Sequence, residues 1–552
     1  MKRSVRGWLI ALVVVVAVNL PARWLDVRWD LTADRRYTVS EQTVHIVEQV
    51  DAPMEVTLYL NGEMNSAFRR LSRSVTDMIE TLHRTNKLFR LRDTDIAPHE
   101  LVLLERRGCK AVVISERTRD GKTVQTDVWP YLSIKYKQRE MVLPLLEQNR
   151  GIDPEQNINR SVENIEFVLA EAVHSLMKDS VERVAFIEGH GELSKEQVYD
   201  LTAQLSRYFQ VDRGVMGNET GVLDAYKAVI IADPQRPFSE TDKYILDQYI
   251  MHGGKVMWLL NGVRFSDEML TDDGVTPILP LDLNLNDMLF RYGLRINPAL
   301  VQDLQCLRIP VDVSDDPQRP QYQPLPWTYA PLLLTNEQSP VTRNTMQVSA
   351  TMASCIDIVG GEDGLTKEVL LATSTASALT PTPARVDLSD LSIEQDAFRY
   401  AYIPVAVSVE GLFNSFFTHR IAPEDMVLHE PLKTEGTSRQ VVVAAGSVAR
   451  NEWQNGEPLA AGFDRYSKTL FGNRDFLVRS VLWLTDDKDL LSLRKRTIAL
   501  RQINERRAYD NRTRIECISL FAPAVILLLI GGCVRLVRTY RYARQNKNFE
   551  QP

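Results

Sequence analysis

Cysteine is scarce in this chain, with five residues among 552. No two of them form a CxxC pair, which argues against a cysteine-rich zinc site and against a disulfide framework. Three lie in the bulk of the chain, Cys109, Cys306 and Cys355, and two lie in a C-terminal apolar run, Cys517 and Cys533. Cys306 and Cys355 are candidates for one disulfide in an oxidising compartment, although packed free thiols explain them more simply.

The common catalytic signatures are also missing. The chain has no Walker A loop, which a P-loop ATPase needs to cradle phosphate. It has no G-x-S-x-G elbow, no H-E-x-x-H motif and no G-x-G-x-x-G turn. A long chain without these motifs fits binding or coupling better than catalysis. We therefore expect a protein that is not an enzyme, with no catalytic residue, no bound metal and no cofactor.

The bulk of the chain lacks net positive charge. The net charge is −7, but residues 1–7 carry +3 and residues 535–552 carry +4, which leaves about −14 for the rest. Nucleic-acid binding requires a basic surface, so nucleic acid is not expected as a partner. Hydrophobic content of 44% and charged content of 25% are ordinary for folded domains.

An uncharged apolar run near the C-terminus predicts a membrane span. Residues 517–534 read CISLFAPAVILLLIGGCV, which is 18 residues without a charge. A helix needs about 20 apolar residues to cross the hydrocarbon of a bilayer. The basic tail at 535–552 follows directly, and the positive-inside rule places it in the cytoplasm.

A second apolar run begins at Trp8. Residues 1–7 carry three positive charges, residues 8–18 are all apolar, and bulky residues such as Leu20 and Trp24 extend the stretch. The length alone also fits a cleaved signal peptide. Because a small-x-small cleavage site is missing, an uncleaved helix over 8–25 is the preferred interpretation.

Together these runs predict an inner-membrane protein with both termini in the cytoplasm and residues 26–515 outside. One segment runs against the positive-inside rule. Residues 491–516 lie on the outer side of the last span and are rich in arginine. The rule weakens for large translocated domains. The segment fits either a helix near lipid headgroups or a partner, or a solvated connector.

Residues 26–150 have the pattern of a small α/β domain. Ser40 is placed to cap a helix over 41–49, 54–60 is strand-like, and apolar residues from Leu71 to Leu82 recur at helical spacing. A half-buried strand is expected over 87–96, and strands 112–115 and 128–137 are expected to form a hairpin around Asp120-Gly121. The order β-α-β followed by β-β is typical of a thioredoxin-like domain.

Residues 151–490 predict a larger, discontinuous α/β domain. A long helix over 158–177 leads into it. Three buried strands, 184–187, 228–232 and 256–260, are separated by helices capped at Ser194 and Ser239. Apolar strands without alternation indicate a parallel sheet covered on both faces, and we expect a doubly wound, flavodoxin-like arrangement.

The pattern changes between about 300 and 435. This portion is rich in proline, serine and threonine and contains short strands such as 369–373 and 402–409, which predicts loops and antiparallel β-structure. Residues 441–446 again resemble a buried strand, and a helix is expected near 475–484. We expect both to return to the parallel sheet and complete it.

The best candidate site follows the strand at 184–187. Glu188, His190 and Glu192 lie on a loop with two glycines, and Asp233 follows the next strand. Ligands of such sheets bind beyond the carboxyl ends of the strands, and Asn261-Gly262 ends a third strand at the same edge. The four residues are a candidate surface for a ligand, a metal or a partner. A tight turn whose polar groups bond locally explains the loop equally well, and an enzyme using the loop is a further alternative.

Several long segments resemble one family, the accessory proteins of the gliding-motility ABC transporter (GldG). They are 28–40, 184–193, 239–263, 281–306 and 471–487. The family is also similar to auxiliary domains fused to ABC-2-type permeases. Its central domain is similar to a class I glutamine-amidotransferase-like fold found in an intraflagellar-transport protein. No cysteine follows the three buried strands, so the resemblance does not imply amidotransferase activity.

The resemblance implies a non-catalytic accessory subunit of an ABC-type transporter, associated with gliding motility. Its implied partners are a multi-span ABC-2-type permease and a separate P-loop ATPase. The alternative is an extracytoplasmic ligand-binding protein of the same transporter, whose ligand the sequence does not name.

Overall fold

The computed structural model describes residues 39–486, apart from short gaps, and a few residues near the C-terminus. The gaps are at 63, 93–95, 108, 118–122, 147–153, 179–180, 313, 315–318, 320, 344, 361–363, 389–392 and 394. The C-terminal residues described are 527–529, 531–537 and 539. The chain divides into two compact units, Met1–Thr497 and Ile498–Pro552.

The predicted membrane segments lie mostly outside the described residues. This holds for the tail at 1–7, the helix at 8–25, the juxtamembrane helix at 491–516 and most of 517–552. Within 517–534, residues 527–529 and 531–534 are described and are helical. In the part of the chain that is described, no helix is both long and apolar enough to cross a bilayer. The two predicted spans stay predictions.

The N-terminal part of the first unit is built on a four-stranded mixed sheet. Its order is β2-β1-β5-β6, with β1 and β2 parallel and the other two pairs antiparallel. The strands are β1 (Met54–Leu58), β2 (Phe89–Leu91), β5 (Tyr131–Tyr136) and β6 (Arg139–Pro144). Helix α3 (Ser66–Thr85) connects β1 to β2. This is the predicted order of β-α-β followed by β-β; the closer comparison with thioredoxin stays a prediction.

The predicted helices of this part form as expected. Ser40 accepts a hydrogen bond from the backbone N–H of Thr43 and caps α2 (Glu41–Glu48). In α3 the apolar stripe from Leu71 to Leu82 is buried, as its helical spacing predicts. Helix α5 (Pro154–Met177), assigned above to the second domain, packs against α2, α3 and β6.

Two local predictions in this part are wrong. The expected strand over 87–96 shrinks to β2 and is followed by α4 (Pro98–Arg106), a helix with only Leu104 buried and hence little apolar periodicity. The hairpin forms, but β3 (Val112–Arg117) pairs with β4 (Thr123–Val128), not with 128–137. Pro130 separates β4 from β5 because it has no backbone N–H to continue the ladder.

The large sheet has a parallel half in the spatial order β8-β7-β9-β10-β23. In chain order this is 2-1-3-4-5, the doubly wound arrangement that the sequence predicts. The strands are β7 (Arg183–Ile187), β8 (Gln210–Gly214), β9 (Ala228–Ala232), β10 (Lys255–Leu259) and β23 (Glu435–Val443). The return of residues 441–443 to the sheet is confirmed. The mixed α/β class is therefore confirmed, and the closer likeness to amidotransferases stays a prediction.

Both faces of the parallel half are covered, which explains why its strands do not alternate in polarity. In β9, Ala228, Ile230 and Ala232 belong to one core, which includes α6 (Tyr199–Leu205) and α10 (Asn473–Leu484). Val229 and Ile231 belong to the opposite core, with α7 (Glu240–Met251). Burial on both sides requires apolar residues at every position.

Helix α6 begins later than its sequence signal suggests. Ser194 and Gln197 exchange the expected reciprocal hydrogen bonds: the Ser194 N–H donates to Gln197 Oε1 at 2.9 Å and the Gln197 N–H donates to Ser194 Oγ at 3.4 Å. The helix nevertheless runs only over Tyr199–Leu205, because residues 195–198 form turns before it. By contrast, α7 begins at the predicted cap, with a complete capping box between Ser239 and Asp242.

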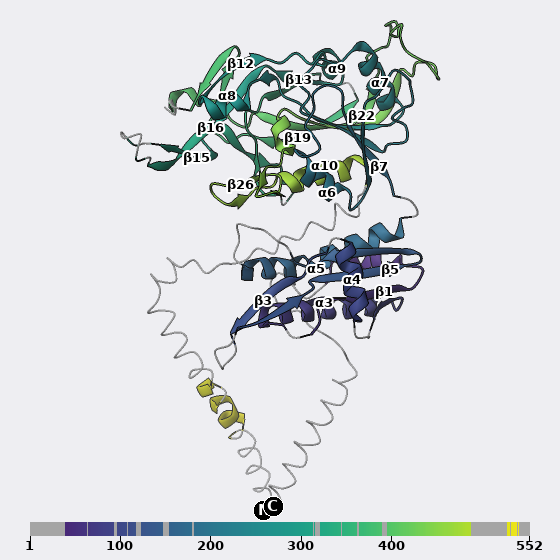
Figure 1. Cartoon of the computed structure of the whole chain (residues 1–552), viewed down its shortest axis with the longest axis vertical. Helices are drawn as coiled ribbons and strands as arrows, with labels where there is room; N and C mark the ends of the chain where they lie inside the picture. The colour runs from purple at the N-terminus through teal and green to yellow at the C-terminus, as the bar shows by residue number, and fades with distance from the viewer. Residues whose placement is uncertain are drawn as a thin grey trace, which may run out of the picture. The chain divides into compact units, whose positions relative to one another are not determined.

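The sheet continues from β23 as an antiparallel half, in the order β22-β19-β16-β15. These strands are β15 (Cys306–Asp312), β16 (Tyr322–Thr335), β19 (Leu365–Ala372) and β22 (Pro404–Asn414), with β17 (Val348–Ser349) beside β16. The predicted β-rich portion is confirmed, and Figure 1 shows β15 and β16 as a long hairpin. Prolines expected in loops, such as Pro310 and Pro324, instead lie within this edge hairpin, where a missing N–H costs little.

Smaller elements complete the larger part of the unit. They are β11 (Val263–Arg264), α8 (Asp267–Asp272), β12 (Val275–Pro280), α9 (Asn286–Arg291), β13 (Leu294–Asn297), β14 (Ala299–Asp303), β18 (Cys355–Ile358), β20 (Ser377–Pro381), β21 (Ala384–Asp387), β24 (Trp453–Gln454), β25 (Glu457–Pro458), β26 (Phe463–Asp464) and β27 (Thr469–Leu470).

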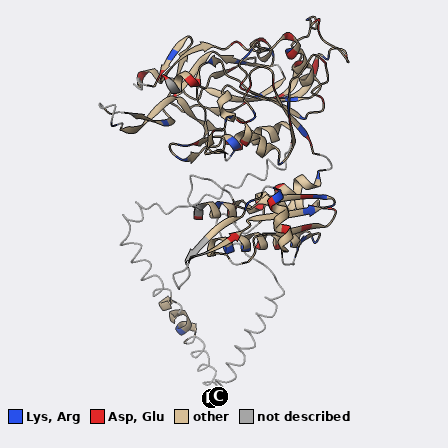
Figure 2. Cartoon of the chain, viewed as in Figure 1, with Lys and Arg blue, Asp and Glu red and all other residues tan. Residues whose placement is uncertain are grey.

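Cys306 and Cys355 do not form the disulfide for which the sequence made them candidates. Cys306 and Cys355 are free thiols, Cys355 is buried, and burial raises the pKa of the Cys306 thiol to about 11. Such a thiol is a poor nucleophile. Acidic and basic positions are interspersed along the described ribbon in the view of Figure 2.

Candidate functional site

The loop that follows β7 lies at the point where the strand order of the parallel half reverses. In the sheet, β8 lies on one side of β7, and β9, β10 and β23 follow on the other side, so the strand order changes direction at β7. In sheets of this type, ligands bind outside the carboxyl ends of the strands at this point. Gly189 and Gly191 have φ of 125° and 79°, a backbone region that favours glycine, and they turn the chain sharply between Glu188 and Glu192.

Glu188 is held by a neighbouring strand. Its Oε1 accepts a hydrogen bond from Arg213 Nε at 2.7 Å, and Arg213 also donates to the backbone carbonyl of Leu193 at 2.9 Å. The Arg213 guanidinium lies over the Phe186 ring, 5.2 Å from its centroid. Arg213 therefore ties the ends of β7 and β8 together, and Glu188 is its counter-ion.

His190 lies between two carboxylates. Its Nδ1 is 3.2 Å from Glu192 Oε1, and its Nε2 is 3.1 Å from Asp242 Oδ2. The ring stacks on Phe238 with a centroid distance of 3.7 Å and an interplanar angle of 11°. Only the imidazolium form can donate to both carboxylates at once, because the neutral ring has one N–H.

This environment changes the acidity of His190. Burial by itself would lower the pKa, but the hydrogen bonds and charges of Asp242 and Glu192 outweigh it and raise the pKa to about 9. For Asp242, burial is likewise the largest influence and would raise the pKa, yet the bonds from His190 and Ser239 hold it below its usual range. His190 is therefore a cation at neutral pH.

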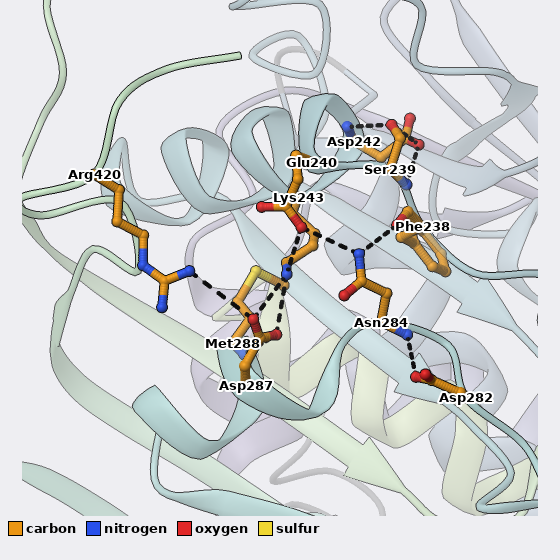
Figure 3. A network of polar contacts seen from close by, with 10 residues as sticks. All are labelled: Phe238, Ser239, Glu240, Asp242, Lys243, Asp282, Asn284, Asp287, Met288 and Arg420. Atoms are coloured by element: carbon orange, nitrogen blue, oxygen red, sulfur yellow. Dashed lines mark hydrogen bonds and ion pairs between the residues drawn. The ribbon is translucent and has the colours of Figure 1, made fainter.

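Asp242 joins this cluster to helix α7. Its Oδ2 also accepts from the backbone N–H of Ser239 at 3.0 Å and from Ser239 Oγ at 2.6 Å. Figure 3 shows this capping contact at the start of the helix. The loop after β7 is thus fastened to the N-terminus of α7, 52 positions along the chain from His190.

Helix α7 carries further buried polar contacts on its next turns. Lys243 is fully buried and its Nζ bonds Glu240 Oε1 and both carboxylate oxygens of Asp287 at 3.0 Å, as Figure 3 shows. Asp247 accepts from Tyr292 Oη at 2.7 Å and from Ser415 Oγ at 2.6 Å. Buried charges require such partners. These bonds fix α7 to α9 and to the end of β22.

Asp233 forms a separate group at the ends of β9, β10 and β23. Its φ of 58° is unusual for a residue with a side chain. Asp233 Oδ1 accepts from Asn261 Nδ2 at 2.7 Å and from Gln235 Nε2 at 3.1 Å. The Gly446 N–H donates in turn to Asn261 Oδ1 at 3.0 Å. Asp233 and Asn261 therefore bond to each other at the edge of the sheet where their strands end.

Burial also shifts the acidity of Asp233. The side chain loses water, which raises its pKa to about 6, while the charge of Arg450 opposes this shift and the charge of Asp267 adds to it. Arg450 and Asp267 form an ion pair with each other. The carboxylate is therefore mostly ionised at neutral pH, although Asp233 as a residue is only 9% exposed.

The sequence identified only part of these contacts. His190 and Glu192 are brought together, whereas Glu188 and Asp233 each have other partners. Local bonding thus accounts for the loop residues, and the shared ligand surface stays a prediction. Among the described residues, no group of three His, Cys, Asp or Glu side chains is arranged to hold a metal ion. Sequence patterns did not reveal Asp242 or Arg450. For Asp242 a signal was available, because an acidic residue three positions after the cap Ser239 is typical of a capping box.

Gly446 should not tolerate a side chain. A Cβ at this position would overlap the Asp233 carboxylate, so Gly446→Ala is expected to lower the free energy of unfolding by about 1–3 kcal/mol. Hydrogen exchange of peptides that cover β9 and β23 in the full-length variant measures this locally. Gly214→Ala is the control, because Gly214 ends β8 and a Cβ there would meet no atom within 4 Å. Equal effects of the two substitutions would contradict the close contact.

Comparison with known proteins decides the family. A family model described as "ABC-type uncharacterized transport system" matches residues 182–480, more than half of the chain. The chain belongs to this family. The match covers the parallel and antiparallel halves of the large sheet and all four candidate residues. A second model, described only as a domain of unknown function, matches residues 33–135.

Other comparisons add little to the family assignment. No curated protein matches the chain. The solved structures that resemble it include the mmIFT52 N-terminal domain (13% identity, TM-score 0.33, 55% of this chain and 97% of that chain) and a putative ThuA-like protein from Parabacteroides merdae (10% identity, TM-score 0.27, 56% of this chain and 91% of that chain). At these TM-scores the likeness carries no argument about fold or function.

Proposed function

We propose that this family member is a non-catalytic accessory subunit of an ABC-type transporter in the cell envelope. The observation that carries the proposal is the family match over residues 182–480. The contacts at the strand ends support a non-catalytic role, because Glu188, His190 and Glu192 bond to one another or to nearby structural residues. A general acid or base would instead need an open route to its substrate.

The proposed partners follow from what this chain lacks. It has no P-loop, so ATP hydrolysis would come from a separate ATPase, and transport would pass through a separate multi-span permease. The two apolar runs would anchor the chain in the inner membrane, with its bulk outside the cytoplasm. The resemblance of segments 28–40 and 471–487 to the gliding-motility accessory family extends the proposal to that process.

Affinity purification of the full-length chain from its own membranes tests this function. We expect a permease and a P-loop ATPase to co-purify with it. An arginine in the C-terminal apolar run, Leu528→Arg, should weaken this association because a charge within the hydrocarbon is costly. Val215→Arg is the matched control, since Val215 is 69% exposed in the described part.

Two results would contradict the proposal. One is a full-length protein that always purifies alone in mild detergent. The other is a reporter fusion that places residue 300 in the cytoplasm, which would reverse the proposed topology.

A second candidate is a ligand-binding protein of the same transporter. One observation favours it: the Asp233 carboxylate lies buried at the carboxyl end of β9 and has one oxygen without a hydrogen-bond donor among the described residues.

A further inference from the structure

Four exposed arginines lie where helix α3 packs against helix α5. Arg69, Arg70 and Arg73 lie near the start of α3, and Arg160 lies in the second turn of α5. Arg70 Nη2 donates to Asn159 Oδ1 at 2.5 Å, and Asn159 is the neighbour of Arg160 in the chain. This bond brings the arginines of the two helices onto one surface, which we call the arginine surface.

The arginine surface has no counter-ions of its own. In the described part of the chain, none of its four guanidinium groups forms an ion pair with a carboxylate. Other arginines of the N-terminal part do form such pairs: Arg92 with Glu100 at 2.9 Å and Arg107 with Glu140 at 2.8 Å. The unpaired charges are therefore a property of this surface and not of the whole part.

The arrangement is also unfavourable for helix α3. Arg69 and Arg73 stand four positions apart, so their like charges are neighbours on the helix surface and repel each other. The first turn of α3 has no acidic residue, and Asp77 and Glu80 lie further along the helix. Positive charge near the start of a helix also opposes the helix dipole. Residues that work against their own helix without a partner in the fold are typical of a functional surface.

The chemistry of the surface selects a partner rich in phosphate. All four residues are arginines, whose guanidinium group donates two parallel N–H bonds to phosphate oxygens. Four such groups on two adjoining helices match an extended array of phosphates better than one small anion. Nucleic acid is one such array, but the acidic bulk of the chain disfavours it. A membrane surface with anionic lipids is the other, and each basic residue near it strengthens binding about fivefold.

We propose that Arg69, Arg70, Arg73 and Arg160 form a docking surface for the phosphate groups of anionic lipids. The guanidinium N–H groups donate to the phosphate oxygens, and the N-terminal part of the chain rests on the bilayer through this surface. The inference rests on the proposed membrane anchoring, because the apolar run at 8–25 would hold this part near lipid headgroups. It adds to the proposed function a contact with lipid that needs neither the permease nor the ATPase.

Arginine-selective labelling with phenylglyoxal tests the proposal on the full-length chain in lipid nanodiscs. Mass spectrometry gives the labelling rate of each arginine in discs of phosphatidylcholine alone and in discs with one third phosphatidylglycerol. We expect the four arginines to react at least threefold more slowly in the anionic discs at low salt, and to lose this protection at high salt. Arg106 is the internal control, since it is exposed on α4 and should react equally in both discs.

Three results of the labelling would overturn the proposal. One is an equal rate for the four arginines in the two kinds of disc. Another is equal protection of Arg106, which would show a general effect of anionic lipid. The third is full protection in phosphatidylcholine discs by added glycerol phosphate or by a DNA oligonucleotide, which would assign the surface to a free phosphate or to nucleic acid.

A double variant separates lipid binding from a role in the fold. Arg69→Gln with Arg73→Gln should at least halve the protection of Arg70 and Arg160 in anionic discs. Arg106→Gln with Lys110→Gln is the matched control, because it removes the same charge from exposed positions elsewhere in the N-terminal part. Hydrogen exchange of α3 should be no faster in the first variant, since a repulsion is removed. Faster exchange there, or unchanged protection, would overturn the assignment.

Failure of this proposal and failure of the proposed function can be told apart. A chain that purifies with a permease and an ATPase but shows no protection by anionic lipid would lose only the arginine surface. A chain that shows the protection but always purifies alone would lose only the transporter role. A chain that does not enter nanodiscs would contradict the proposed anchoring, and the lipid contact with it.

Discussion

Replacing His190 with glutamine should destabilise the region around β7 and α7 by about 3 kcal/mol at pH 6 and by much less at pH 10. The pKa of His190 is raised from 6.5 to about 9 in the folded chain. One pKa unit corresponds to about 1.4 kcal/mol. A raised pKa on a base means that the folded state binds the proton more tightly than the unfolded state. The stabilisation is complete below pH 6.5 and is lost as the pH rises through 9.

The measurement should be local, because a chain with several folded parts has no single unfolding transition. Hydrogen exchange of peptides that cover β7 and α7 gives the opening free energy of this region at each pH. His45→Gln is the matched control, since His45 is exposed on α2 and bonds only to Gln49 among the described residues. An effect of His190→Gln that is the same at pH 6 and pH 10 would contradict the two-carboxylate explanation.

A second variant distinguishes the stabilisation that comes from the charge of His190 from the stabilisation that comes from the helix cap at Ser239. Ser239→Ala removes two hydrogen bonds of Ser239 Oγ, one accepted from the Asp242 N–H and one donated to the Asp242 carboxylate, and should cost about 1–2 kcal/mol at any pH in the range. The pH dependence of the wild type should persist in this variant, because His190 keeps both carboxylate partners.

Replacing Asp233 with asparagine should stabilise its surroundings by about 3 kcal/mol at pH 8 and have little effect at pH 4. Burial raises the pKa of Asp233 from 3.8 to about 6. The folded state therefore binds the proton more tightly than the unfolded state between these values, and stability falls as the pH rises through this window. Asparagine carries no charge to desolvate, keeps the acceptor for Asn261 and Gln235, and tolerates positive φ.

Hydrogen exchange of peptides over β9 and β10 at pH 4 and pH 8 measures the effect. Asp282→Asn serves as the control for loss of an exposed carboxylate and should show no such difference. Destabilisation by Asp233→Asn at pH 8 would mean that the carboxylate is paired in the folded chain.

Local signals in the sequence were sufficient for much of the parallel half. The strands at 184–187 and 228–232 are short, apolar at every position and separated by helices, which is possible only with cover on both faces. Ser239 and Asp242 stand three positions apart, so the start of α7 depends on contacts within one turn. These features are local, and the structure confirms them.

Strand pairing in the N-terminal part depends on contacts between residues that are distant in the sequence. The sequence predicted that a strand over 128–137 pairs with 112–115, yet β4 pairs with β3 and β5 pairs with β1. Pro130 marks the break between β4 and β5, but the choice of partner depends on which apolar face can be buried in the assembled sheet. For the same reason, prolines near 310 and 324 suggested loops, although an edge hairpin accommodates them.

For the candidate site, the sequence by itself determined the strand ends and the residue types that occupy them: the turn at Glu188–Glu192, Asp233, and Asn261. Periodicity and turn chemistry are properties of neighbouring residues, so the chain carries them before it folds. Only the tertiary structure decided that His190 faces Asp242, that Glu188 pairs with Arg213, and that Asn261 bonds to both Asp233 and Gly446. These side chains are distant in sequence, and only the order of strands in the sheet brings them together.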